Sequence, residues 1–208
     1  MVSFLPRPDS IYEYPSVEYA DALANYIAER SQAMNLDRGE RLRILEAGAG
    51  EGRLSFLLDE ALEGIGVECD VLPVDDFSWH THVKGGGFSI ASEQDTIDAL
   101  ADFRPHLAIT AWAPGNMFSK WTSAFRDDPG VAEYLFIGIP HEISSELMWA
   151  DGDTGSKDYY NRTIAEPAYV TDGFVRVDMP DFTDLQLCYT STKEKIHPSV
   201  TIAFRPAE

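Results

Sequence analysis

Short apolar runs alternate along the first two thirds of the chain with longer stretches in which apolar residues recur every three or four positions. The short runs predict buried strands, and the longer spacing predicts amphipathic helices. The expected helices cover 16–32, 54–62, 96–103 and 119–126, and the expected strands cover 43–47, 67–74, 88–90, 107–110 and 134–139. This alternation predicts an α/β domain in which a parallel sheet is covered by helices on both faces.

The last third of the chain has a different pattern. Residues 141–173 are irregular and polar, whereas 185–190 and 199–204 have the composition of two strands separated by a turn. Strands this close in sequence can pair antiparallel but cannot form a crossover, so an antiparallel C-terminal hairpin is expected. We therefore expect one domain over 1–208, with an N-terminal helical cap at 1–33 and an irregular lid or insert at 141–180.

Charge and cysteine content narrow the range of partners. The chain has 16 basic and 35 acidic residues, a formal net charge of −19, which repels nucleic-acid phosphates and anionic lipids. The N-terminus lacks the pattern of a signal peptide and no window is apolar enough to span a membrane, so a cytoplasmic protein is expected. Cys69 and Cys188 form no disulfide framework or zinc motif, and we expect reduced thiols and no metal site.

The strongest functional signal is the stretch from Leu42 to Arg53, which reads LRILEAGAGEGR. It places a buried strand, an acidic residue and three alternate glycines directly before a helix, which is the outline of a nucleotide-type cofactor loop. A dinucleotide fingerprint, G-x-G-x-x-G, needs a glycine where Arg53 stands. The spacing therefore argues against a nicotinamide dehydrogenase.

The segment from Glu46 to Gly52 resembles motif I of the class I S-adenosylmethionine-dependent methyltransferases. The resemblance implies a Rossmann-like, three-layer α/β/α sandwich with a mostly parallel seven-stranded sheet, in which the last strand is inserted beside the fifth. It also implies S-adenosylmethionine as the cofactor and methyl transfer as the reaction, here to an oxygen or nitrogen of a small molecule. In that family the glycines pass beneath the methionine part of the cofactor, and the acidic residue, here Glu46, lies near its amino-acid end.

Ligands of open α/β sheets bind beyond the carboxyl ends of the strands, so the residues that follow each expected strand are candidates. Asp75 and Asp76 follow the second strand, where a carboxylate can accept hydrogen bonds from both ribose hydroxyls, and Asp75 is favoured. The resemblance places an adenine contact near Ile90 and the transferred methyl group near Trp112, whose aromatic face suits a sulfonium. The full set of candidate cofactor residues is Glu46, Ala47, Gly48, Gly50, Gly52, Asp75, Asp76, Ile90, Ala111 and Trp112.

Methyl transfer requires a base only where the acceptor loses a proton. His141 follows the fifth expected strand and is the leading catalytic candidate, with Glu142, His80 and His82 as alternatives. Two further histidines, His106 and His197, stand at strand beginnings, on the wrong edge of the sheet, and are discounted.

Aromatic residues near both ends of the expected fold suggest a lid over a small organic acceptor. They are Tyr12, Tyr14, Tyr19, Trp149, Tyr159, Tyr160 and Tyr169. The chain lacks the Asn/Asp-Pro-Pro-aromatic tetrapeptide of amino- and base-modifying family members, which supports an alternative: a degenerate, non-catalytic binding or regulatory subunit. The oligomeric state stays open, with a homodimer as one arrangement.

Overall fold

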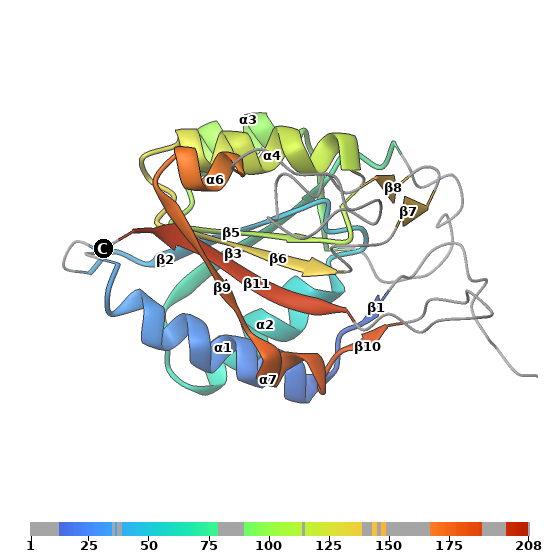
Figure 1. The fold of residues 1–208 in the computed structure, drawn as a ribbon. Helices are drawn as coiled ribbons and strands as arrows, with labels where there is room; N and C mark the ends of the chain where they lie inside the picture. Colours follow the sequence, from blue (N-terminus) through green and yellow to red (C-terminus); the bar gives the residue numbers. More distant parts are fainter. Residues whose placement is uncertain are drawn as a thin grey trace, which may run out of the picture.

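The computed structural model describes residues 13–34, 36, 39–78, 90–113, 115–138, 143–144, 147–148, 167–188 and 199–207. These form a central sheet with helices on both faces (Figure 1). The helices are α1 (Val17–Ser31), α2 (Arg53–Gly64), α3 (Thr96–Phe103), α4 (Gly115–Asp127), α6 (Ala168–Thr171) and α7 (Pro180–Thr183). The strands are β1 (Glu13–Tyr14), β2 (Leu42–Ala47), β3 (Cys69–Asp75), β4 (Ser92–Glu93), β5 (Leu107–Ala111), β6 (Glu133–Gly138), β7 (Ile143–Ser144), β8 (Leu147–Met148), β9 (Phe174–Asp178), β10 (Leu187–Cys188) and β11 (Val200–Pro206).

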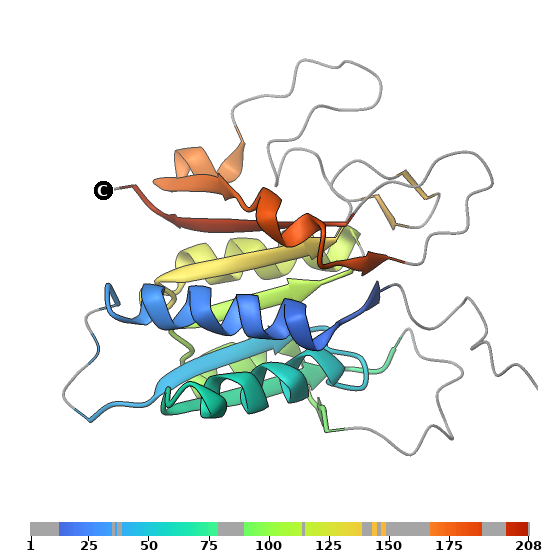
Figure 2. The same ribbon diagram turned by 90° about the horizontal axis from the view of Figure 1, so that it is seen from below.

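The main sheet has seven strands in the order β4-β3-β2-β5-β6-β11-β9. The five strands from β4 to β6 are parallel, and β11 is inserted antiparallel between β6 and β9. Helices α3, α4 and α6 cover one face, and α1, α2 and α7 cover the other (Figures 1 and 2). The prediction of a three-layer, mostly parallel seven-stranded sheet whose last strand lies beside the fifth is confirmed.

Two tightly packed clusters hold the layers together, one on each face of the sheet. On the face of α3 and α4, stacked rings of Tyr134 and Phe204 have centroids 4.7 Å apart. On the face of α1 and α2, Leu23 and Ile27 of α1 are fully buried against strand residues. Because side chains alternate along each strand, one strand supplies both clusters, as Leu45 and Ile44 of β2 do.

Most of the early elements form where the sequence pattern predicts them. Ser16 caps α1, and its side chain accepts a hydrogen bond from the backbone N–H of Tyr19 at 3.1 Å. Helix α3 has the predicted bounds, since Asp95 caps its start and Arg104 ends it in a left-handed conformation before Pro105. Helix α4 begins four residues earlier than expected.

The predicted third strand at 88–90 is wrong at Ile90, which is the part of this range that the structure describes. The strand that pairs with β3 is Ser92–Glu93, and Ile90 lies outside it, while 88 and 89 fall outside the described residues. The backbone N–H of Ile90 instead donates to the carbonyl of Glu51 at 3.1 Å, so this stretch binds the loop after β2 before it joins the sheet.

The predicted antiparallel pairing at the C-terminal end of the sheet is confirmed, but the strand predicted to pair with β11 is wrong. Strand β11 pairs with Phe174–Asp178, whereas the described part of the expected strand at 185–190 is Leu187–Cys188, which pairs with β1. Sequence proximity allowed the predicted pairing, but both edges of β11 are filled by strands that lie further away along the chain. Strand β9 comes from the segment expected to be a lid at 141–180.

The carboxyl ends of the parallel strands face two small sheets (Figure 1). One is the β1-β10 pair, on the side of α1, and the other is the β7-β8 pair, on the side of α4. Of the helices within the described ranges, none has the length and hydropathy needed to cross a bilayer.

Candidate functional site

The glycine loop, residues 48–52, connects the carboxyl end of β2 to the first turn of α2. Its three glycines all have positive φ: 67° at Gly48, 58° at Gly50 and 80° at Gly52. Gly52 is the N-cap of α2 and offers no side chain to the helix terminus. The alternation of glycines in the sequence is therefore matched by three left-handed positions, which other residues rarely adopt.

Three backbone amides of this loop donate to acceptors within the chain. Ala49 N donates to the carbonyl of Val74 and Gly52 N donates to the carbonyl of Ala49, both at 2.9 Å. Gly50 N donates to Asp75 Oδ2 at 2.8 Å. A phosphate-binding loop presents such amides to its ligand, whereas this loop uses these three to hold its own shape.

Two of the glycines are also required by packing. A Cβ placed on Gly48 would lie 2.8 Å from Cη2 of Trp121, and one placed on Gly52 would lie 2.7 Å from Cγ1 of Ile90. Both separations are shorter than side chains tolerate. The close approach predicted for a ligand at these positions is thus made, at Gly48 and Gly52, by side chains of the chain itself.

Glu46 lies at the end of β2 with only 3% of its surface exposed. Its Oε2 accepts hydrogen bonds from the backbone N–H of Ser55, at 3.1 Å, and from the Ser55 hydroxyl. Ser55 is the third residue of α2, so Glu46 satisfies a helix-terminal amide that the glycine N-cap cannot. Sequence reasoning did not identify Ser55; its only signal is its place in the first turn after the loop.

The protonation of Glu46 is shifted by its surroundings. Burial raises the pKa of its carboxyl to about 7, the Ser55 hydrogen bonds oppose this rise, and the negative charge of Asp75 adds to it. Glu46 is therefore poised to ionise near neutral pH when a positive charge comes close.

The two aspartates after β3 differ in their surroundings. Asp75 is 8% exposed, and its oxygens accept from two backbone amides, Gly50 N at 2.8 Å and Phe77 N at 2.7 Å. Asp76 is exposed, and its Oδ1 accepts from Ser78 N at 2.9 Å. A carboxylate has about four acceptor positions, so Asp75 keeps capacity for ligand hydroxyls while it fixes the glycine loop.

Two aromatic residues beyond the strand ends have strained backbones. Trp112, directly after β5, has φ 53°, and Phe77, two residues after β3, has φ 51°. Each is fixed by its own amide, since Trp112 N donates to the carbonyl of Ile137 at 2.9 Å and Phe77 N donates to Asp75. Bulky residues in this conformation cost about 1 to 3 kcal/mol and concentrate at ligand sites. The sequence pointed to Trp112 but not to Phe77.

The remaining cofactor candidates occupy the same edge of the sheet. Ala47 and Ala111 are the last residues of β2 and β5, which are neighbouring parallel strands. Ile90 is 45% exposed and adjoins Gly52. The predicted residues come from four separate segments, which the structure brings to one edge of the sheet, and Asp75 and Ile90 contact the glycine loop itself.

The catalytic candidates cannot be placed in the same way. His141, Glu142, His80, His82 and His197 lie outside the described residues.

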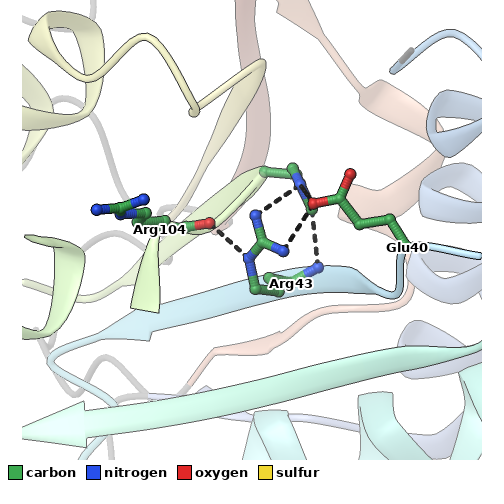
Figure 3. Close-up of polar contacts among 4 residues, drawn as sticks. Glu40, Arg43 and Arg104 are labelled. Atoms are coloured by element: carbon green, nitrogen blue, oxygen red, sulfur yellow. Dashed lines mark hydrogen bonds and ion pairs between the residues drawn. The ribbon is translucent and has the colours of Figure 1, made fainter. Parts of the chain in front are cut away.

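His106 precedes β5 at the opposite, amino edge of the sheet, as expected. It contacts Arg43 and Glu40, and Arg43 in turn donates to the carbonyl of Arg104 at 2.7 Å (Figure 3). Burial and the nearby Arg43 lower the pKa of His106. These contacts give His106 a structural role.

The aromatic lid is contradicted at two of its expected members. Tyr169 is buried against Phe204, with ring centroids 5.0 Å apart, and belongs to the core. Tyr19 is 1% exposed, and its hydroxyl is 2.7 Å from that of Thr201. Tyr12, Trp149, Tyr159 and Tyr160 fall outside the described residues, as does the side chain of Tyr14.

No protein-family model and no curated protein matches the chain. Solved structures are similar to it at low identity. A precorrin-6y C5,15-methyltransferase from Geobacter metallireducens GS-15 is 11% identical, with a TM-score of 0.47 over 86% of this chain and 87% of that one. A ribosomal protein L11 methylase from Lactobacillus delbrueckii subsp. bulgaricus is 14% identical, with a TM-score of 0.46 over 95% and 82%. Human N-acetylserotonin methyltransferase, solved with S-adenosylmethionine, is 15% identical, with a TM-score of 0.41 over 92% and 56%.

These similarities concern the fold and assign no activity to the chain. In its glycine-loop sequence and in the placement of its last strand beside the fifth, the chain resembles class I S-adenosylmethionine-dependent methyltransferases.

Proposed function

We propose that this protein is an S-adenosylmethionine-dependent methyltransferase that acts on an oxygen or nitrogen of a small molecule in the cytoplasm. The observation that carries the proposal is the placement of Glu46 at the N-terminus of α2, where its carboxylate accepts the Ser55 amide. In a dinucleotide-binding fold the pyrophosphate takes that position. A buried carboxylate there repels an anion and favours a cofactor whose charges at this end include a cation.

The acidic side chains around the loop fit such a cofactor. Glu46 and Asp75 lie close enough for the negative charge of Asp75 to raise the pKa of the Glu46 carboxyl. Their combined negative potential suits an ammonium or a sulfonium, and the committed amides of the loop leave little for a pyrophosphate. In this proposal Glu46 binds the amino-acid end, and Asp75 or the more exposed Asp76 binds the ribose.

Trp112 would border the reactive centre. Its strained position beyond β5 keeps a half-buried aromatic residue at the sheet edge, and an aromatic face attracts a positive charge by about 0.5 to 2 kcal/mol. When bound, S-adenosylmethionine supplies a methyl group activated on a positively charged sulfur. The chain would align the acceptor and exclude water, with His141 as the proposed base where the acceptor loses a proton.

A second candidate is a degenerate member of this fold that does not transfer methyl groups. The packing of Trp121 on Gly48 and of Ile90 on Gly52 favours it. A larger residue at either position would clash with these side chains, so the presence of two of the glycines is explained without a ligand. Both candidates can bind S-adenosylmethionine, but only the first transfers its methyl group.

Calorimetry with S-adenosylmethionine, S-adenosylhomocysteine and NADH tests the proposal. We expect binding of the two sulfur compounds and none of NADH, and a screen of amine, phenol and acid acceptors to release S-adenosylhomocysteine. Binding without release across the screen would favour the degenerate candidate. If the protein binds neither S-adenosylmethionine nor S-adenosylhomocysteine, the proposed function is refuted.

A further inference from the structure

Strand β9 is the last strand of the seven-stranded sheet, beyond β11, within the part of the chain that the structure describes (Figure 2). Directly after β9, Met179 N donates to the carbonyl of Thr201 at 3.1 Å, in continuation of the β9–β11 register. Because hydrogen-bonded pairs alternate along an antiparallel ladder, every second residue before Met179 also bonds to β11. The backbone groups of the residues between them point away from β11, toward the edge of the sheet. These residues are Phe174, Arg176 and Asp178.

The side chains of β9 alternate between an apolar and a charged set. Val175 and Val177 lie on the face of α1, where Val175 is 40% exposed and Val177 is half-buried against the cluster on that face. Arg176 and Asp178 share the opposite face and form an ion pair with each other. Edge strands commonly carry charges that prevent pairing with another chain. Here the two charges have opposite signs, so they oppose some pairings and favour one.

A second copy of the chain can pair antiparallel with this edge about a two-fold axis. The outward-pointing residues of the two copies meet only if the axis is level with a residue and does not pass between two residues. An axis at Arg176 or at Asp178 places that residue opposite its own like charge, and an axis at Val175 places neither charge opposite its counterpart. An axis at Val177 places Arg176 opposite Asp178 of the second copy on both sides of the axis.

We propose that β9 pairs with β9 of a second copy about a two-fold axis at Val177, which joins the two sheets into one. Arg176 of each copy exchanges main-chain hydrogen bonds with Asp178 of the other, and the charges of the two copies alternate across the axis. On the other face, the exposed Val175 meets Met179 of the second copy. The axis is perpendicular to the sheet, so α6 and α7, which lie on opposite faces, do not meet across the junction (Figure 1). This inference does not depend on methyl transfer.

The strength of association is the first test. Pairing of five-residue strands buries less surface than a stable dimer does, so we expect reversible association with a Kd on the order of 100 µM. Sedimentation equilibrium between about 5 and 500 µM measures it. The net charge of −19 on each copy opposes association, so the buffer should contain about 0.15 M salt to screen it. An unchanged protein that stays monomeric over this range overturns the proposal.

Charge reversal tests the register. Arg176→Asp and Asp178→Arg each place like charges opposite one another, and each should weaken self-association by at least about tenfold. An equimolar mixture of the two variants brings opposite charges together again on both sides of the axis. We expect it to form a mixed dimer with a Kd within about threefold of that of the unchanged protein. A mixture that stays monomeric while both variants remain folded overturns the register.

Asp70→Arg is the matched control for charge reversal. Asp70 lies in β3 and also belongs to an exposed ion pair, with Arg41 at 2.8 Å, but it is remote from β9 in the sheet order. This variant should associate as the unchanged protein does. Equal weakening in Asp70→Arg and Asp178→Arg would contradict pairing through β9.

Cysteine cross-linking tests the same register without a change of charge. Val177→Cys places a thiol opposite its own counterpart, with Cα atoms about 4.5 Å apart, so mild oxidation should produce a reducible dimer. Val175→Cys is the control, because its counterpart lies about 13 Å away along the paired strands. The unchanged protein, which keeps Cys69 and Cys188, gives the background. No cross-link in Val177→Cys above that background, or an equal one in Val175→Cys, overturns the proposal.

Discussion

Two buried carboxylates, at opposite edges of the same sheet, have different partners. Glu133, at the amino end of β6, is fully buried, and its Oε2 is 2.7 Å from Nε of Arg30 while Oε1 accepts from the Tyr26 hydroxyl. Glu46, near the carboxyl end of β2, is 3% exposed and receives hydrogen bonds from the neutral Ser55 only, among the described residues.

The difference between the two carboxylates is whether a cation of the chain itself lies beside them. A buried carboxylate that has its own arginine is electrically complete and ties α1 to the sheet. A buried carboxylate that has only neutral hydrogen-bond donors and lies beside a second carboxylate is stabilised by no positive charge, so its pKa is raised. Burial of Tyr26, together with the charge of Glu133 and the hydrogen bond to it, raises the pKa of Tyr26, whereas at the other edge Glu46 itself has a raised pKa.

The largest effect is expected at the amino edge. Arg30→Ala leaves Glu133 buried without a counter-charge and should lower the free energy of unfolding by about 3 kcal/mol. Chemical denaturation measures this loss. As a control, Arg176→Ala removes the exposed pair of Arg176 with Asp178 and should cost less than about 1 kcal/mol. Equal losses in the two variants would contradict a specific role for the buried pair.

Glycines at the two edges should respond differently to alanine. Gly48, at the carboxyl edge, and Gly39, before β2 at the amino edge, both have positive φ, but only a Cβ at Gly48 meets another side chain. Gly39→Ala should therefore cost about 1 kcal/mol from backbone strain, and Gly48→Ala about 2 kcal/mol or more once the contact with Trp121 is added. Thermal unfolding compares them, and a smaller loss at Gly48 would refute the packing argument.

Ligand binding should depend on Glu46 and not on the neighbouring acid. Glu46→Gln keeps the shape and a partner for Ser55 but removes the negative charge, so affinity for S-adenosylmethionine should fall about tenfold, or about 1.4 kcal/mol. Glu51→Gln is the matched control, since Glu51 stands in the same loop and already has Arg53 as its ion-pair partner at 2.8 Å. Calorimetry should show little change for the control. Equal losses of affinity in the two variants would indicate a general effect of charge and would contradict a specific role for Glu46.

The smallest effect concerns pH. The pKa of Glu46 rises to about 7 in the folded protein from an ordinary value of 4.5, so the folded state holds this proton more tightly than the unfolded chain does. The resulting stabilisation is complete below about pH 4.5 and is lost as pH rises through about 7. Between pH 6 and pH 7 the unchanged protein should lose about 1 kcal/mol more stability than Glu46→Gln.

The same proton affects binding of a cation, with the opposite sign. Because S-adenosylmethionine should favour the ionised carboxylate, its affinity should increase as pH rises through about 7, and the increase should disappear in Glu46→Gln. Titration calorimetry in buffers of different ionisation enthalpy measures the released proton. An affinity independent of pH would contradict the assignment of Glu46 to the cationic end of the ligand.

The sequence by itself determined most of the local elements and indicated where a candidate site lies. Apolar periodicity predicted the helices that lie between the parallel strands and most of those strands. The spacing of apolar residues reflects whether one face of a helix or a whole strand is buried. The alternation of Gly48, Gly50 and Gly52 predicted a sharply turning loop, and all three glycines have positive φ. Asp75 and Trp112 could be named because ligand sites in this architecture follow strand ends.

Only the tertiary structure decided what fills the space around those residues. The pairing of β11 with β9, the packing of Trp121 on Gly48 and the capping of α2 by Glu46 join positions far apart in the chain. Such contacts depend on which surfaces the fold brings together, and no local pattern records them. For the same reason the sequence does not show that the buried hydroxyl of Thr110 lacks a hydrogen-bond partner among the described residues.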